Sequence, residues 1–121
     1  MLNDSNGAAF SKIYIACGYT DLRRGIDGLA GVVQQNFQLN PYEKNVLFLF
    51  CGRRTDRIKA LLWEGDGFLL LYKRLESGRF QWPRSKKEVA ELTPRQYQWL
   101  MEGLQIYQKS ALKEVKPSRI A

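Results

Sequence analysis

Apolar residues recur at two different spacings in the first part of this chain. Residues 13–17 form a short, mostly apolar run that ends at Gly18, which predicts a β-strand. From residue 22 to residue 37 apolar side chains recur every three or four positions, which predicts an amphipathic helix with one buried face. Thr20 or Asp21 can cap the N-terminus of this helix. The predicted buried face comprises Leu22, Ile26, Leu29, Val33 and Phe37.

Three glycines lie inside this predicted helix. Gly25, Gly28 and Gly31 follow one another at intervals of three residues. Each costs up to about 1 kcal/mol relative to alanine in a helix interior. We therefore expect a close approach of another backbone at these positions, either from the protein's own sheet or from a partner.

The middle of the chain has the pattern of successive antiparallel strands. Residues 46–51 are apolar throughout, so the strand has no solvent-facing side and belongs in the middle of a sheet. Residues 57–63 and 68–75 flank a Glu-Gly-Asp-Gly sequence that predicts a hairpin. Residues 79–82 predict a fourth strand, which Pro83 stops at a sheet edge.

The last helix has the clearest start signal. After a predicted linker at residues 84–91, Thr93 and Gln96 form a capping box, with Pro94 at the first helical position. Together the elements predict an α+β fold, an antiparallel β-meander of about four to five strands packed with two main helices. We expect a single domain at residues 12–108, a flexible lead-in at 1–11 and a basic, disordered tail at 109–121. The expected buried face of the last helix comprises Tyr97, Leu100, Met101 and Leu104.

The composition excludes several kinds of chemistry. The chain has no histidine, which excludes His-based nucleophile triads, His-containing zinc sites and imidazole catalysis. Cys17 and Cys51 are expected to be small buried side chains in a reducing compartment. No run approaches the roughly 20 apolar residues that cross a bilayer, and residues 1–12 lack the pattern of a signal peptide. We therefore expect a cytoplasmic protein without membrane contact.

Carboxylates alone can also hold metal ions for phosphoryl transfer. Here Asp21 and Asp27 fall on different faces of the predicted helix, and Asp56 and Asp66 occupy predicted turns, where aspartate is favoured for backbone reasons. We interpret them as cap and turn residues. The sequence thus predicts no catalytic residue, no metal and no cofactor. The carboxylates that could serve such chemistry are Asp21, Asp27, Asp56, Glu64 and Asp66.

Positive charge is concentrated in one part of the sequence. The formal net charge is +7, and between residues 53 and 87 ten Lys or Arg outnumber four Asp or Glu. Side-chain alternation places the cations of the predicted hairpin towards the end away from its turn. The sequence therefore predicts a cationic rim at one end of the sheet, and a polyanion is the natural partner of such a rim.

We expect this rim to bind DNA mainly through phosphates. Trp63, Tyr72 or Trp82 could stack on unpaired bases beside it. The alternative is that the cations form a solvated surface and the aromatic rings belong to the core. The predicted nucleic-acid-binding residues are Arg53, Arg54, Arg57, Lys59, Lys73, Arg74, Arg79, Trp82, Arg84, Lys86 and Lys87.

Several segments in series resemble one family of proteins from bacterial mobile elements. The segments are residues 14–29, 53–59, 61–68 and 92–104, together with Lys73-Arg-Leu-Glu-Ser-Gly-Arg-Phe-Gln-Trp-Pro83. The chain resembles the TnpB-type accessory protein, the product of the second open reading frame, of the IS66 family of insertion sequences. The resemblance implies a transposition system in which a separate, larger transposase carries the catalytic chemistry.

Three hypotheses about function follow. The first is a non-catalytic accessory protein of transposition that binds DNA with low sequence specificity and acts with the transposase. The second is a protein–protein interaction module without direct DNA contact, which docks through the glycine-bearing helix or an apolar patch at Trp99, Gly103 and Ile106. The third is a carboxylate-dependent nuclease. Homo-oligomerisation is compatible with each of them, and the sequence leaves open whether the DNA is single- or double-stranded.

Overall fold

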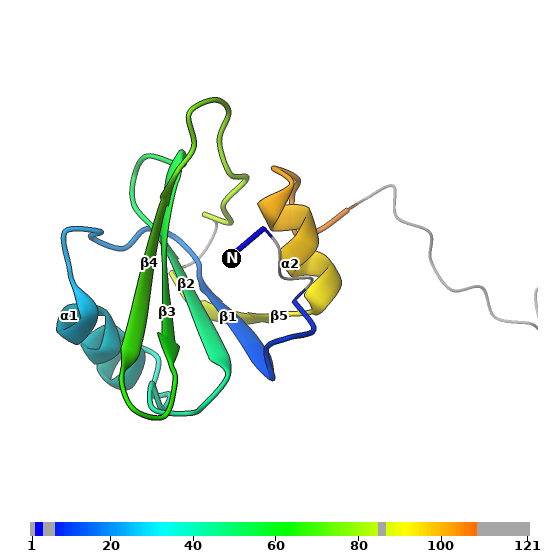
Figure 1. The fold of residues 1–121 in the computed structure, drawn as a ribbon. Coiled ribbons are helices and arrows are strands. Elements are labelled where there is room, and N and C mark those ends of the chain that lie inside the picture. Colours follow the sequence, from blue (N-terminus) through cyan, green and yellow to red (C-terminus); the bar gives the residue numbers. More distant parts are fainter. Residues whose placement is uncertain (1, 4–6, 85–86, 109–121) are drawn as a thin grey trace, which may run out of the picture.

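The structure is a computed structural model in which residues 2–3, 7–84 and 87–108 are described. Within these residues the strands form one sheet in the order β4-β3-β2-β1-β5. Figure 1 shows α1 on one face of the sheet and α2 on the other. In chain order the elements are β1 (Lys12–Ala16), α1 (Ile26–Gly31), the π-helix η1 (Val32–Asn36), β2 (Val46–Cys51), β3 (Arg57–Trp63), β4 (Phe68–Arg74), β5 (Val89–Leu92) and α2 (Pro94–Met101).

The predicted α+β fold is confirmed, with a sheet that is mostly antiparallel. β2, β3 and β4 form the predicted meander, and β5 pairs with β1 in an antiparallel register. β1 and β2 are parallel, and α1 and η1 lie in the crossover that joins them. The parallel pair was not part of the meander prediction, and it brings the C-terminal ends of β1 and β2 to the same end of the sheet.

Each face of the sheet packs against its own hydrophobic core. Leu47 and Leu49 of β2 belong to the core that includes residues of α2, whereas Phe48 and Phe50 belong to the core that includes residues of α1 and η1. All of β2 is buried as a result, which confirms its predicted place inside the sheet. Alternating side chains therefore explain why a strand without polar residues is stable here.

The predicted fourth strand is wrong, because residues 79–82 form no strand. This segment is a loop, but the side chains of Phe80 and Trp82 within it are buried. The indole Nε1 of Trp82 donates a hydrogen bond to the carbonyl of Ala16 at 2.9 Å. The fifth strand is β5, which lies in the segment predicted as a linker. It was missed because a four-residue strand with one buried side chain has too short a pattern to be recognised without its partner β1.

The first helix begins later than predicted. Gly25 is its N-cap residue, and Asp21 instead accepts a hydrogen bond from the backbone N–H of Arg23 in the preceding turn. A Cβ added at Gly25 or Gly31 would meet no atom of the described residues within 4 Å. The expectation that these two glycines permit close packing against the sheet is therefore wrong.

The last helix begins as predicted. Thr93 Oγ1 accepts a hydrogen bond from the backbone N–H of Gln96, and the Gln96 side chain accepts one from the Thr93 N–H, which confirms the capping box. The buried face differs from the prediction because α2 ends at Met101. Leu104 is exposed and Ile106 is buried, so the proposed apolar patch that included Ile106 does not form.

Both cysteines are buried and free, as predicted. Burial raises the pKa of the Cys51 thiol to about 11 and also raises the pKa of Cys17. Both side chains are therefore protonated thiols at neutral pH. No helix in the described part of the chain is long and apolar enough to span a bilayer.

Tyr97 should make stability fall at high pH. Its ring is fully buried, its hydroxyl donates to the carbonyl of Leu2 at 2.7 Å, and burial raises its pKa to about 12. An unfolded tyrosine ionises near pH 10. The contribution of Tyr97 to the free energy of unfolding is therefore fully present below that pH and is lost as the pH rises towards 12. Ionisation in the unfolded state should cost about 2 kcal/mol of unfolding free energy across this window.

Urea denaturation from pH 9 to pH 11.5 measures this effect. The Tyr97→Phe variant should lack that share of the pH dependence, whereas Tyr107→Phe at an exposed position should retain it. Equal pH profiles for Tyr97→Phe and the wild type would contradict the assignment.

Candidate nucleic-acid interface

The strand registers bring residues from distant parts of the sequence to one end of the sheet. Arg57 at the start of β3 pairs with Arg74 at the end of β4, and Arg53 and Arg54 follow the end of β2 directly. The parallel pairing of β1 with β2 brings Tyr19, just beyond β1, to the same end. The cations of this end therefore come from the connection after β2 as well as from the β3–β4 hairpin.

A groove of about 780 Å³ opens beside this end of the sheet. Of the described residues that line it, five are Arg or Lys and one is a carboxylate, so its electrostatic potential is positive. We call it the cationic groove. Its lining residues are Tyr19, Thr20, Asp21, Leu22, Arg23, Gly52, Arg53, Arg54, Arg57, Lys59, Leu70 and Tyr72.

Two of the predicted cations are held in place by aromatic rings. The guanidinium carbon of Arg53 lies 4.7 Å from the centroid of the Tyr19 ring, and Nη2 of Arg53 donates to the Tyr19 hydroxyl at 3.1 Å. Nζ of Lys59 donates to the carbonyl of Arg24 at 2.9 Å and lies 5.8 Å from the centroid of the Tyr72 ring. These contacts orient the two cations, and within the described part of the chain neither forms an ion pair with a carboxylate.

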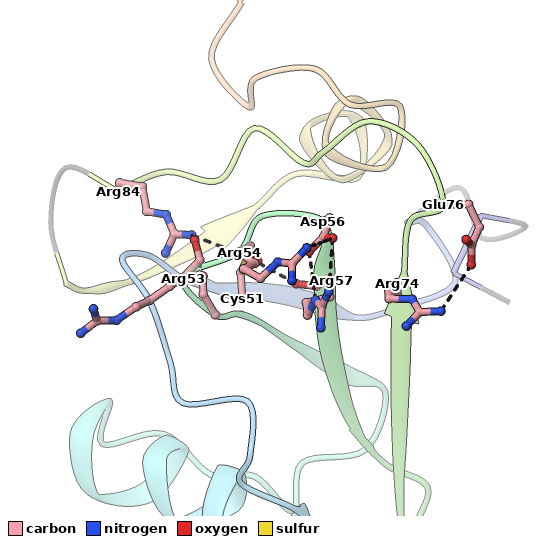
Figure 2. Close-up of polar contacts among 9 residues, drawn as sticks. Cys51, Arg53, Arg54, Asp56, Arg57, Arg74, Glu76 and Arg84 are labelled. Carbon is pink, nitrogen blue, oxygen red and sulfur yellow. Dashed lines mark hydrogen bonds and ion pairs between the residues drawn. The ribbon is translucent and has the colours of Figure 1, made fainter.

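Two aspartates offset part of the positive charge. Asp56 accepts ion-pair contacts from Arg57 at 2.9 Å and from Arg54 at 3.3 Å, and Figure 2 shows both guanidinium groups converging on it. Asp21 pairs with Arg23 at 2.9 Å. The hydrogen bond from Arg23 lowers the pKa of Asp21 to about 2, and the hydrogen bond from Arg57 lowers the pKa of Asp56. Both carboxylates therefore stay ionised at neutral pH, and three of the five positive charges remain in excess.

Of the predicted residues that the structure describes, six do not line the cationic groove, and the first three are Lys73, Arg74 and Arg79. Lys73 is on the opposite face of the sheet, where its Nζ donates to Oδ1 of Asn3 at 2.6 Å. Nη2 of Arg74 lies 3.6 Å from Oε1 of Glu76, and Figure 2 shows this ion pair apart from Asp56 and its two arginines. Arg79 lines a smaller adjoining cavity of about 300 Å³ together with Arg53 and Arg54. Charge at this end is thus spread over more than one surface.

Arg84 has a structural role at the edge of the groove. Its Nη1 donates to the carbonyl of Gly18 at 2.7 Å, and its Nη2 donates to the carbonyls of Gly52 at 2.6 Å and Arg53 at 3.2 Å. The side chain therefore ties the loop after β1 to the loop after β2. Lys87 lies over the Tyr19 ring, 5.7 Å from its centroid, and Lys86 falls outside the described residues.

The three candidate stacking residues differ in their environments. Trp82 is buried and hydrogen-bonded to the backbone, so it belongs to the core and is removed from the candidate interface. Trp63 packs edge-on against Tyr42 and Phe68 at the other end of β3. Tyr72 is 55% exposed and lines the cationic groove.

Sequence reasoning missed two residues that line the groove, Tyr19 and Arg23. Both precede the cation-rich segment by about thirty positions along the chain, so a count of local charge does not connect them with it. The adjacent arginines after the first predicted strand were a usable signal. They would have been included had β1 been predicted as parallel to β2, because parallel neighbours end at the same side of a sheet.

The carboxylates of the nuclease hypothesis do not converge. Asp56 precedes β3, and Asp66 lies in the turn that follows it, so the two residues occupy opposite ends of this strand. A shared metal site needs ligands within coordination distance of one ion. These two residues therefore cannot form a site together.

Comparison with known proteins identifies the family. The chain matches the family described as IS66 Orf2 like protein over residues 11–111. It is 39% identical over 93 residues to the uncharacterized protein y4hO of Sinorhizobium fredii, which covers 77% of this chain and 80% of that protein. The uncharacterized protein y4jC of the same organism is 31% identical over 121 residues, 100% of both chains. No solved structure matches the chain. The chain belongs to the IS66 Orf2-like family.

Proposed function

We propose that this protein binds DNA through the cationic groove as a non-catalytic accessory factor of transposition, acting beside a separate transposase. Membership of the IS66 Orf2-like family implies an accessory, transposition-related role. The observation that supports DNA as the ligand is the gathering of five cations around one groove, with two carboxylates to offset them.

The arrangement suits phosphate groups better than base edges. Arg53 and Arg54 are exposed on a connecting loop, where long side chains can follow a phosphate backbone of any sequence. Phosphate contacts provide affinity and position, whereas sequence is read by groups that reach base edges. We therefore expect low sequence specificity for the protein alone. Selection of the element's ends then falls to the transposase or to the assembled complex.

Affinity for DNA should depend steeply on salt. If about four of the groove cations contact phosphates, a plot of log affinity against log salt concentration should have a slope of about −3.6 with duplex DNA and about −2.8 with a single strand. Fluorescence anisotropy with duplex and with single-stranded DNA measures this slope. A flat response with both forms, or no binding to either at low salt, would exclude the groove as a DNA site.

The second candidate function is docking onto another protein of the transposition complex. It is favoured by Leu104 and Tyr107, which are exposed just beyond α2, where they could contact the transposase. Co-purification with the transposase from nuclease-treated extract separates the two functions. A complex that survives nuclease treatment and is lost with Tyr107→Ala would support docking through this surface.

A further inference from the structure

Tyr72 occupies an unusual place among the aromatic residues of the sheet. It lies on β4, an edge strand, directly opposite Lys59 of β3 in the register. On the same face, Arg57 pairs with Arg74 one step towards the cationic end, and Leu61 pairs with Leu70 one step away from it. The Tyr72 ring is thus located at the boundary between the cations and the apolar part of this face.

Packing does not account for this ring. Tyr72 is 55% exposed, whereas the ring of Tyr14 on the same sheet face stacks on Phe48 at a centroid distance of 5.5 Å. Nζ of Lys59 lies 5.8 Å from the ring centroid, and Tyr72 still remains exposed and lines the groove. Tyr19, the other aromatic residue lining the groove, has Arg53 and Lys87 over its ring. Tyr72 is therefore the ring best placed to receive a ligand.

We propose that the cationic groove binds an unpaired stretch of DNA, with a base stacked on Tyr72 and the flanking phosphates held by Arg53, Arg57 and Lys59. This inference rests on the proposed function and specifies its ligand. An exposed aromatic ring on a sheet face, bordered by cations, is the arrangement by which proteins bind single strands without strong sequence preference.

Duplex DNA cannot stack a base on such a ring. In a duplex the faces of each base are covered by its neighbours, so a tyrosine on an open sheet face meets only phosphates and sugars. In a single strand the bases can turn out and stack on the ring while the backbone follows the cations. Tyr72 thus adds affinity only for the unpaired form, and the arginines add affinity for both.

Fluorescence anisotropy at constant low salt tests the inference with three probes of equal length. The probes are a single strand of mixed sequence, an abasic strand with the same phosphates and the corresponding duplex. The wild type should bind the single strand about 10-fold more tightly than the abasic strand, which is the contribution of a base stacked on an aromatic ring. Tyr72→Ala should lose that difference and retain its affinity for the abasic strand.

Two further variants control for indirect effects. Tyr72→Phe keeps an aromatic ring and should bind the single strand as the wild type does. Tyr107→Ala removes a more exposed tyrosine that does not line the groove and should leave all three affinities unchanged. Circular dichroism verifies that each variant is folded.

The outcomes separate this inference from the proposed function. Equal binding of the single strand and the abasic strand by the wild type would overturn stacking on Tyr72. Tighter binding of the duplex than of the single strand would also overturn it, while DNA binding through the groove would still stand. Failure to bind any of the three probes would instead exclude the proposed function itself.

Discussion

Replacing Arg53 and Arg54 together by glutamate should weaken DNA binding by about 100-fold at low salt and reduce the salt dependence of the remaining affinity by about half. Each substitution removes a phosphate contact and adds a repulsive charge. Both residues line the cationic groove and the smaller cavity next to it, so any DNA on this end of the sheet passes them. This pair is the most sensitive point of the proposed interface.

The fold should survive this change. Both side chains are exposed, and the part of Arg53 that contacts Arg84 is its backbone carbonyl, which the substitution leaves in place. Exposed substitutions of this kind usually change the free energy of unfolding by less than about 0.5 kcal/mol. Circular dichroism and thermal denaturation measure whether the variant is folded.

A matched control has the same change of net charge at the other end of the sheet. Lys12 and Lys44 are exposed there, near the start of β1 and the β3–β4 turn. The Lys12→Glu and Lys44→Glu double variant should bind DNA only slightly less tightly than the wild type. If the two double variants lose the same affinity, total charge and not the groove determines binding.

Replacing Trp82 by alanine should lower the free energy of unfolding by about 3–5 kcal/mol, the range for removal of a large buried aromatic side chain. Trp82 is 6% exposed, and its indole N–H donates a hydrogen bond to the carbonyl of Ala16 at the end of β1. The alanine variant creates a cavity and also removes a hydrogen bond from a buried backbone group. Urea denaturation at neutral pH measures the loss.

Trp82→Phe separates the two contributions. Phenylalanine retains most of the packing but leaves the Ala16 carbonyl without its indole donor, so it should cost about 1–3 kcal/mol. The folded phenylalanine variant should bind single-stranded DNA as tightly as the wild type. A stable alanine variant with weakened DNA binding would show instead that Trp82 belongs to the interface, as the sequence had predicted.

Arg84 connects the loop after β1 with the loop after β2. Its guanidinium bonds the carbonyls of Gly18, Gly52 and Arg53, and so positions the backbone that carries Tyr19 and the groove arginines. A cation can therefore lie beside the proposed DNA interface and still have its hydrogen bonds committed to the backbone. For the same reason Arg84 is unsuitable for charge reversal, because its loss would alter the loop geometry as well as the charge.

Local patterns were sufficient for several elements. The unbroken apolar run became the buried strand β2, the Glu-Gly-Asp-Gly sequence became the turn between β3 and β4, and Thr93 with Gln96 formed the predicted capping box. Each depends on interactions between residues that are close in the chain or on strand periodicity. The excess of cations between residues 53 and 87 is likewise a property of the sequence alone.

Long-range pairing decided what the local patterns could not. The parallel alignment of β1 with β2 brought Tyr19 and Arg23 to the groove, and β5 formed because β1 offered it a partner. The packing also determined which aromatic residues are accessible, because Trp82 is buried in the core and Tyr72 is exposed. Spacing along the chain indicates which side chains share a face of one element. Only the packing of distant elements determines which face is buried, because burial removes apolar surface from water.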